Sequence, residues 1–255
     1  MALLCLCFYL NSAVSQNPPA RTVHVFVALA DNEHQGIVPV PPRLGNGLDP
    51  ARNLYWGAAA GVRTFFARSS DWALLSCVQK PKPEILERCV FKHRRAEVYL
   101  VADAYRGDEI RQAIFDFFDA AAGASPERIA LPASPAGTLT VRGGSNLVAY
   151  VGHDGLMDFQ LPLVPRKKND IHRDAIILAC ASKQYFGDAL RTAGAYPLLW
   201  TTNLMAPEAY TLKSALDGWI AGETNEHIRE RTAVAYDKYQ KCGLRGARRL
   251  FVTGW

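Results

Sequence analysis

The chain has 255 residues, of which 49% are hydrophobic and 21% are charged, with a formal net charge of +5. These fractions are close to those of average globular proteins, so they exclude disordered, collagen-like and fibrous classes. The 29 lysines and arginines only slightly outnumber the 24 aspartates and glutamates, and both kinds are spread along the chain. Because nucleic-acid binding needs a concentrated basic face, we expect no nucleic-acid partner.

The first fifteen residues are typical of a targeting segment. They carry no charge, and residues 2–10 form an apolar run that is too short to cross a bilayer as a helix. Residues 13–15 fit a small-x-small cleavage site, whereas the usual basic start is missing. We therefore predict a truncated signal peptide over 1–15, a linker over 16–22, export to the periplasm or the medium, and no stable membrane insertion afterwards. A buried first strand is the alternative, because a short apolar run is ambiguous by itself.

Four cysteines follow this segment. Cys77 and Cys89 flank a stretch with two prolines and two lysines that fits a loop between two strand ends. In an oxidising compartment these two cysteines should form a disulfide, leaving Cys180 free. No CxxC or Cys/His spacing of a metal site occurs, so we expect neither a metal nor another cofactor.

Apolar runs and helical patterns alternate along the remaining chain. In chain order, the sequence predicts a strand over 23–30, a helix from Asp49 to about Arg68, strands over 71–78 and 97–102, a helix after Asp108, an irregular segment over 126–144, strands over 146–151 and 175–179, a helix from Ser182, a strand over 198–201, and helices over 207–221 and 225–242. Residues 89–91 are expected to pair with 71–78.

This alternation favours a parallel sheet with helices on both faces. We predict one α/β domain over residues 23–255, a three-layer sandwich around a single, mostly parallel sheet.

Two reactive side chains follow two of these strands. His153 comes after the strand 146–151, and Cys180 comes after the strand 175–179. Because parallel strands end at the same edge of a sheet, the two side chains should come close if their strands are neighbours. A cysteine beside a histidine is the minimum machinery of thiol catalysis, and a helix starting at Ser182 should lower the pKa of Cys180. Alone, each residue has an ordinary alternative as a buried small side chain or a loop histidine.

The segments LVAYVGHDG and AIILACAS resemble the caspase-like cysteine peptidase superfamily, which includes caspases, metacaspases, legumains, gingipains, clostripain and separase. The resemblance covers residues 23–221 in strand order and fits a divergent bacterial-type member. It implies a caspase-like fold, His153 as the general base and Cys180 as the nucleophile. In legumain-like members an asparagine after the first strand orients the histidine, and Asn32 matches that position, with Asp31 as second choice. Asn32 and Asp31 are also ordinary residues for a solvated loop.

The backbone amides around His153 are expected to stabilise an oxyanion; they belong to Gly152, Asp154 and Gly155. Three residues depart from the pattern of the superfamily. Asp154 stands directly after the histidine where the family has glycine, Leu178 replaces the acid found two residues before the cysteine in members specific for basic residues, and Ser182 replaces a glycine. The departures put the oxyanion site and the cleavage preference in question.

The sequence thus predicts a cysteine endopeptidase that cleaves peptide or protein substrates through a thioester. The alternative is a catalytically inactive caspase-like domain that binds or scaffolds other proteins. An α/β-hydrolase lacks support because no G-x-S-x-G motif occurs. Loops 31–46, 103–106 and 202–208 should border the cleft, where Asp103 and Glu208 are the carboxylates that could bind a basic side chain. The sequence does not define an oligomeric state.

Overall fold

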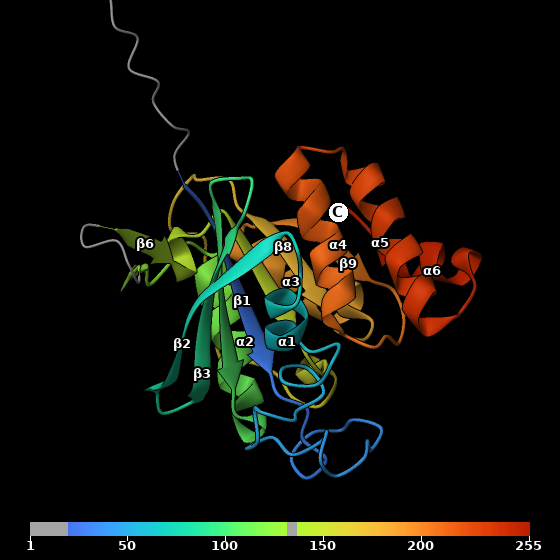
Figure 1. Ribbon diagram of the computed structural model, residues 1–255. Coiled ribbons are helices and arrows are strands. Elements are labelled where there is room, and N and C mark those ends of the chain that lie inside the picture. The colour runs from blue at the N-terminus through green and yellow to red at the C-terminus, as the bar shows by residue number, and fades with distance from the viewer. Residues whose placement is uncertain (1–19, 132–136) are drawn as a thin grey trace, which may run out of the picture.

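The computed structural model describes residues 20–131 and 137–255. Its centre is an eight-stranded sheet with the order β10-β9-β8-β7-β1-β4-β3-β2. Figure 1 shows this sheet together with the helices that pack on it. The strands are β1 (Arg21–Ala28), β2 (Trp72–Lys82), β3 (Ile85–His93), β4 (Val98–Tyr105), β5 (Glu127–Ala130), β6 (Thr138–Val141), β7 (Leu147–Val151), β8 (Asp174–Leu178), β9 (Tyr196–Thr201) and β10 (Phe251–Val252). The helices are α1 (Val62–Ala67), α2 (Ile110–Ala121), α3 (Ser182–Ala193), α4 (Ala209–Ala221), α5 (Asn225–Gln240) and α6 (Leu244–Leu250).

The sheet is mixed rather than all parallel. Strands β4, β1, β7, β8 and β9 run parallel to one another, and all six strands that the sequence predicts lie in this one sheet. The edges are antiparallel, because β2 and β3 form a hairpin, β3 pairs antiparallel with β4, and β10 pairs antiparallel with β9. The connections from β2 to β3 and from β3 to β4 are short, and a short connection can only join neighbouring strands antiparallel.

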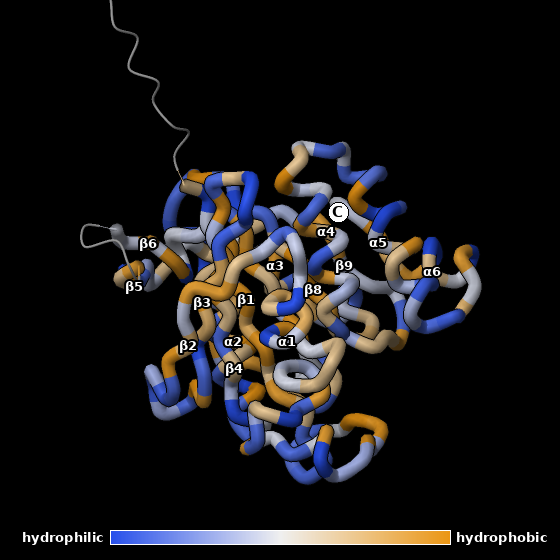
Figure 2. Tube along the Cα trace, viewed as in Figure 1, coloured by the Kyte–Doolittle hydropathy of each residue, from blue (hydrophilic) through white to orange (hydrophobic). Residues whose placement is uncertain are grey.

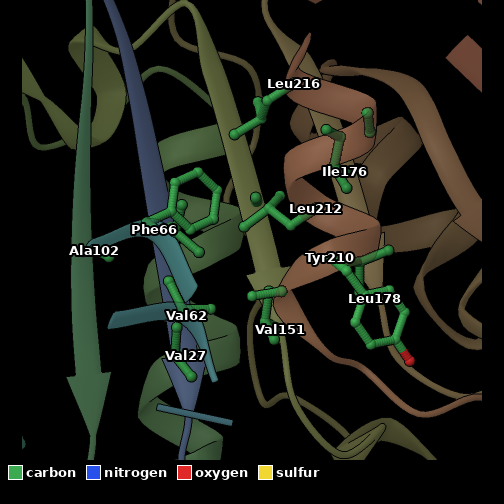
Figure 3. Close-up of a cluster of buried hydrophobic side chains, with 14 of the residues drawn as sticks. Val27, Val62, Phe66, Ala102, Val151, Ile176, Leu178, Tyr210, Leu212 and Leu216 are labelled. Atoms are coloured by element: carbon green, nitrogen blue, oxygen red, sulfur yellow. The ribbon is translucent and has the colours of Figure 1, made fainter. Parts of the chain in front are cut away.

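Helices cover both faces of the sheet. Successive residues of β1 alternate between them: Val25 belongs to the core under α1 and α4, whereas Phe26 belongs to the core under α2 and α3. Figure 3 shows part of the first core, where side chains of α1 and α4 lie against β1, β7 and β8. In Figure 2 the hydrophobic segments concentrate in the central strands, as expected of a sheet buried on both sides.

The predicted helix between Asp49 and Arg68 is wrong over most of its length. Residues 49–61 form turns, and only Val62–Ala67 are helical. The buried Asn53 side chain accounts for this, because it bonds to both backbone groups of Ala30 and to the carbonyl of Asn46. A side chain that bonds to backbone in this way competes with helical hydrogen bonds.

A small hairpin occupies the segment that the sequence predicts to be irregular. Strands β5 and β6 pair with each other, and Leu139 and Val141 pack against Val101 of β4. Since α2 packs on β1 and β7, the hairpin covers the neighbouring strands β3 and β4. Helix α6 and strand β10, at the end of the chain, have no counterpart in the prediction either.

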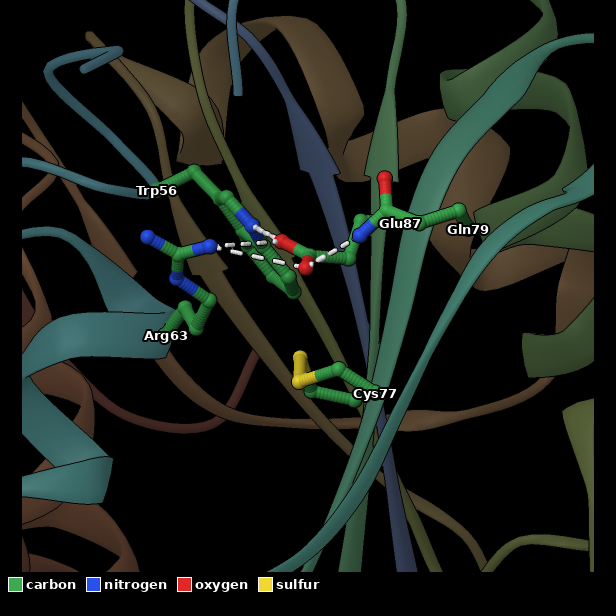
Figure 4. Close-up of a disulfide and its surroundings, with 6 residues drawn as sticks. Trp56, Arg63, Cys77, Gln79 and Glu87 are labelled. Carbon is green, nitrogen blue, oxygen red and sulfur yellow. Dashed lines mark hydrogen bonds and ion pairs between the residues drawn. A yellow bond between two sulfur atoms is a disulfide. The ribbon is translucent and has the colours of Figure 1, made fainter. Parts of the chain in front are cut away.

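The predicted disulfide is confirmed. Cys77 and Cys89 face each other on β2 and β3 and are bonded, while Cys180 and Cys242 have no disulfide partner among the described residues. Figure 4 shows the neighbouring carboxylate of Glu87, which accepts hydrogen bonds from Trp56 Nε1 at 2.5 Å and from Arg63. The disulfide joins the edge strand β2 to its neighbour β3, and Glu87 connects the two strands to α1 and to the turns before it.

The predicted signal peptide at 1–15 lies outside the described residues, as does most of the predicted linker. Strand β1 already begins at Arg21, so residues 21 and 22 belong to the sheet rather than to a linker. Within residues 20–131 and 137–255, no helix combines the length and the apolar character needed to cross a bilayer.

Candidate functional site

His153 and Cys180 follow two strands that are parallel neighbours. Val151 of β7 pairs with Leu178 of β8, so each reactive residue lies two positions beyond the same register pair. The amide of Gly152 donates to the carbonyl of Leu178 at 3.2 Å and continues the pairing past the strand ends. Both side chains line one cavity of about 380 Å³. The expectation that the topology brings His153 and Cys180 to one place is therefore met.

The cavity lies at the carboxyl ends of the parallel strands, where ligands bind in open α/β sheets. Its walls come from the loop after β1, the turn before α1, the segments after β7, β8 and β9, and the end of α5; the lining residues are Gly36, Ile37, Val38, Val40, Leu54, Tyr55, Gly152, His153, Met157, Cys180, Leu204, Met205, Ala206, Pro207, Glu208 and Gln240. Most of these side chains are apolar, as is usual for a substrate pocket.

Two of the three predicted border loops contribute to this cavity. Segments 31–46 and 202–208 line it, whereas none of residues 103–106 does. Asp103 is instead fully buried within β4, where it pairs with Arg88 and His24. The prediction that residues 103–106 border the cleft and that Asp103 can bind a basic side chain is wrong, because the carboxylate already has two internal partners.

The ring of His153 is held by a carboxylate. Its Nε2 lies 2.6 Å from Oδ2 of Asp158, and its carbonyl accepts a hydrogen bond from the hydroxyl of Tyr150 at 2.8 Å. The contact with Asp158 places the ring proton on Nε2 and leaves the lone pair on Nδ1. In the part of the chain that the structure describes, Nδ1 has no hydrogen-bond partner. Imidazole in this tautomer is set to accept a proton at Nδ1.

Cys180 contacts the segment after β9. Its Sγ accepts a hydrogen bond from the amide of Met205 at 3.4 Å and lies 3.6 Å from the carbonyl of that residue. The expected lowering of the thiol pKa is wrong: burial raises the pKa of Cys180, the negative charge of Asp154 adds to the rise, and only the Met205 amide opposes it. The resting cysteine is therefore a neutral thiol that needs a base.

A strained turn follows Cys180. Ala181 adopts a left-handed conformation with φ of 47°, which costs a non-glycine residue about 1 kcal/mol. The buried hydroxyl of Ser182 holds the turn by bonding to the carbonyl of Ile177 and to the side chain of Thr201. Ser182, one of the departures from the superfamily pattern, thus has a structural role in fixing the position of Cys180. Residues under such strain cluster at functional sites.

The backbone amides predicted to bind an oxyanion differ in whether they already donate a hydrogen bond. Those of Gly152 and Gly155 already donate to the carbonyls of Leu178 and His153, respectively. Among the described residues, the amides of Asp154 and Cys180 have no hydrogen-bond acceptor. These two amides belong to the residue after the histidine and to the cysteine itself.

The side chain of Asp154 is buried, and no described residue forms an ion pair with it. Its Oδ1 accepts from the amide of Leu156 at 3.0 Å, while Oδ2 has no hydrogen-bond partner in the described structure. Burial raises the pKa of Asp154 to about 7, and the charge of Asp158 contributes to the rise. The carboxyl group therefore changes its charge near neutral pH, close to the thiol whose ionisation it opposes.

Asn32 bonds within its own loop. Its Nδ2 donates to the carbonyl of Val40 at 2.8 Å, and its Oδ1 accepts from the amide of Val40 at 3.1 Å. Asp31 also has local partners, the amide of Glu33 and the ring of His34. Asn32 therefore braces a loop that lines the cavity, and the contact with His153 belongs to Asp158. No sequence motif marks Asp158, Met205 or Tyr55, so their part in the site was not predicted.

No family model, curated protein or solved structure matches this chain. Among the described residues, the only group of three or more side chains with close metal-binding atoms is Cys77, Glu87 and Cys89. Two of these residues form the disulfide, so they offer no thiolate to a metal.

The raised pKa of Cys180 predicts slow alkylation at neutral pH. We expect the rate of reaction with iodoacetamide to rise with pH and to reach its midpoint above about 8.5, the value of an ordinary thiol. Asp154→Asn should move this midpoint downward, because it removes a negative charge that disfavours the thiolate.

Pulse labelling from pH 6 to 10 with peptide mapping measures this midpoint. The exposed Cys242 is the internal control in every sample. A midpoint below about 7.5 for Cys180 would show that the cysteine is a preformed thiolate and would contradict the prediction.

Proposed function

We propose that this chain is a cysteine endopeptidase of caspase-like fold, with Cys180 as the nucleophile and His153 as the general base. The observation that carries the proposal is that both side chains follow adjacent parallel strands at equivalent positions and line one cavity. The α/β architecture with helices on both faces is compatible with such a fold.

The reaction uses the two side chains in turn. His153 takes the proton of the Cys180 thiol at Nδ1, and the thiolate attacks the carbonyl carbon of the peptide bond. The tetrahedral intermediate collapses to a thioester, the C–N bond breaks, and His153 gives the proton to the departing amine. Water then attacks the thioester while His153 accepts its proton; the carboxylic acid leaves, and the proton returns to the sulfur.

Neighbouring groups assist these steps. The amides of Asp154 and Cys180 are the donors available for the oxyanion that forms during the attack. Asp158 stabilises the imidazolium, because its carboxylate lies 2.6 Å from Nε2. The raised pKa of Cys180 means that proton transfer to His153 accompanies the attack rather than preceding it.

The chain is proposed to work outside the cytoplasm. The disulfide between Cys77 and Cys89 supports this, since disulfides persist mainly in oxidising compartments. The proposed nucleophile, Cys180, is not part of that disulfide.

A catalytically inactive binding domain is the second candidate. Two observations favour it: the thiol of Cys180 has a raised pKa, and Asp154 buries a carboxyl group where the superfamily has glycine. In this case the cavity would bind a protein segment without cleaving it.

The deciding experiment uses the protein with Cys180 as a reduced thiol. One assay measures hydrolysis of a diverse fluorogenic peptide library, and a second measures labelling by a peptide-based electrophile that alkylates active-site cysteines. The proposal expects turnover, modification of Cys180 but not of Cys242, and protection of Cys180 by cleaved peptides. Absence of both turnover and selective modification would reject the peptidase and favour the binding domain.

A further inference from the structure

Glu208 brings a carboxylate to the cavity that holds His153 and Cys180. Its Oε2 accepts hydrogen bonds from the hydroxyl of Tyr210 at 2.7 Å and from Nε2 of Gln240 at 2.9 Å. Both donors are neutral. Among the described residues, no lysine, arginine or histidine lies within ion-pair distance of Glu208, and Oε1 has no hydrogen-bond partner.

The remaining cavity wall does not balance this charge. Glu208 is the only aspartate, glutamate, lysine or arginine among the lining residues. Tyr55 stays neutral, because burial raises its pKa, and the charges of Glu208 and of the thiolate form of Cys180 raise it further. The cavity therefore combines apolar walls with one carboxylate that lacks an internal counter-ion.

The rim of the cavity is apolar and open. Val38 and Leu204 are 84% and 68% exposed, and Met157 is 43% exposed. Such surfaces suit the aliphatic stem of a lysine or arginine, which packs against apolar groups while its charged end seeks a polar partner. A neutral apolar side chain would fill the same walls but would cover the carboxylate without pairing it, which is costly.

We propose that this cavity binds the lysine or arginine side chain of a peptide substrate, with Glu208 as the counter-ion of the cationic group. The inference rests on the proposed peptidase function for the peptide, but the recognition of the cation depends only on the cavity. The inference also makes Glu208, which follows β9, the residue that selects a cationic substrate side chain, because Leu178 on β8 offers no carboxylate.

Binding is tested separately from cleavage. Two acetylated peptide amides that differ only in arginine or citrulline are titrated into the Cys180→Ala protein by calorimetry. Citrulline keeps the shape of arginine and removes its charge. We expect the arginine peptide to bind on the order of 100-fold more tightly. Glu208→Gln in the same background should remove most of this preference, because the amide still accepts from Tyr210 but carries no charge.

Glu230→Gln is the matched control, since Glu230 is a partly exposed residue of α5 that pairs with Arg248 and lies outside the cavity. It should keep the arginine preference. Equal binding of the two peptides, or a preference that survives Glu208→Gln, would overturn the inference.

The peptidase proposal fails by a different result. If the wild type cleaves neutral peptides through Cys180 but shows no preference for arginine, the enzyme stands and the role of Glu208 falls. If the arginine preference depends on Glu208 but no peptide is cleaved, cation recognition stands and the chain is a binding domain.

Discussion

Replacing Cys180 with alanine should reduce peptide hydrolysis by at least about 10⁴-fold, because the thioester cannot form without the sulfur. The fold should persist. The lost atom is small, only partly buried, and its polar contacts are limited to the backbone of Met205. We expect a change in the free energy of unfolding below about 1 kcal/mol. Initial rates on a cleaved library peptide and urea unfolding curves measure the two effects.

The size of the activity loss in the other variants distinguishes the roles of the replaced residues. His153→Ala should lower kcat by about 10³-fold, since the neutral thiol then has to ionise unaided. Asp158→Asn should lower kcat by about 10-fold, because the amide keeps the ring in place but does not stabilise the imidazolium. Asn32→Ala should act on KM rather than kcat, because Asn32 braces a loop that lines the cavity.

Cys242→Ala is the control in this series, since that thiol is exposed and outside the cavity. It should behave as the wild type. Full activity of Cys180→Ala would show that the nucleophile lies elsewhere and would end the assignment based on the two strand ends.

The strands were predictable because the central sheet is buried on both faces. Its strands are nearly continuous apolar runs, for example residues 23–30, and each was found near its expected position. At the edges, the pairing of residues 89–91 with 71–78 was predicted and is found, but the full length of β3 and the strand β10 were not predicted. Strand β10 has only two residues, and the direction of β2 depends on its hairpin with β3 rather than on its own composition.

The failed helix before Arg68 has a tertiary cause. Asp49 followed by proline is a sound helix start by local rules, but the Asn53 side chain completes the hydrogen bonds of Ala30 at the end of β1. This contact joins residues that are distant along the chain, so no local pattern contains it.

The sequence predicted the positions of the two reactive residues in the fold, but not the side chains that contact them. His153 and Cys180 follow adjacent strands, and the parallel topology fixes where such residues meet. The partner of the histidine was not predictable, because Asp158 lies in an irregular segment without a motif. The ionisation of Cys180 was predicted in the wrong direction, since the helix after it is visible in the sequence while the burial of the thiol is not.

A second large effect is expected far from the cavity, at Asp103. This fully buried carboxylate accepts two hydrogen bonds from Arg88, at 2.6 and 2.7 Å, and one from His24 at 3.0 Å. Asp103→Ala should cost about 3–5 kcal/mol of unfolding free energy, because it leaves the largely buried guanidinium of Arg88 with only Glu127. Urea unfolding at pH 7 measures the loss. Asp170→Ala is the control, since Asp170 is fully exposed and its removal should change little.

Asparagine should rescue this position only in part. The Nδ1 of His24 accepts a hydrogen bond from the amide of Arg142, so Nε2 carries the proton and donates to Asp103. The aspartate accepts from both His24 and Arg88, whereas an asparagine has one acceptor oxygen and would turn its NH₂ toward a donor. We expect Asp103→Asn to lose about 2 kcal/mol or more.

The loss of stability at acid pH provides an independent test of the role of Asp103. Burial alone would raise the pKa of Asp103, but the hydrogen bonds from Arg88 and His24 and the charge of Arg88 hold it well below its usual value. The unfolded chain protonates this carboxylate below about pH 4, whereas the native state keeps it ionised at lower pH. The contribution of Asp103 to the free energy of unfolding is therefore complete above about pH 4 and declines as the pH falls. Asp103→Asn should show a shallower loss of stability between about pH 4 and pH 2. An equally steep loss in the variant would mean that other carboxylates control the acid transition, because an asparagine has no proton to take up.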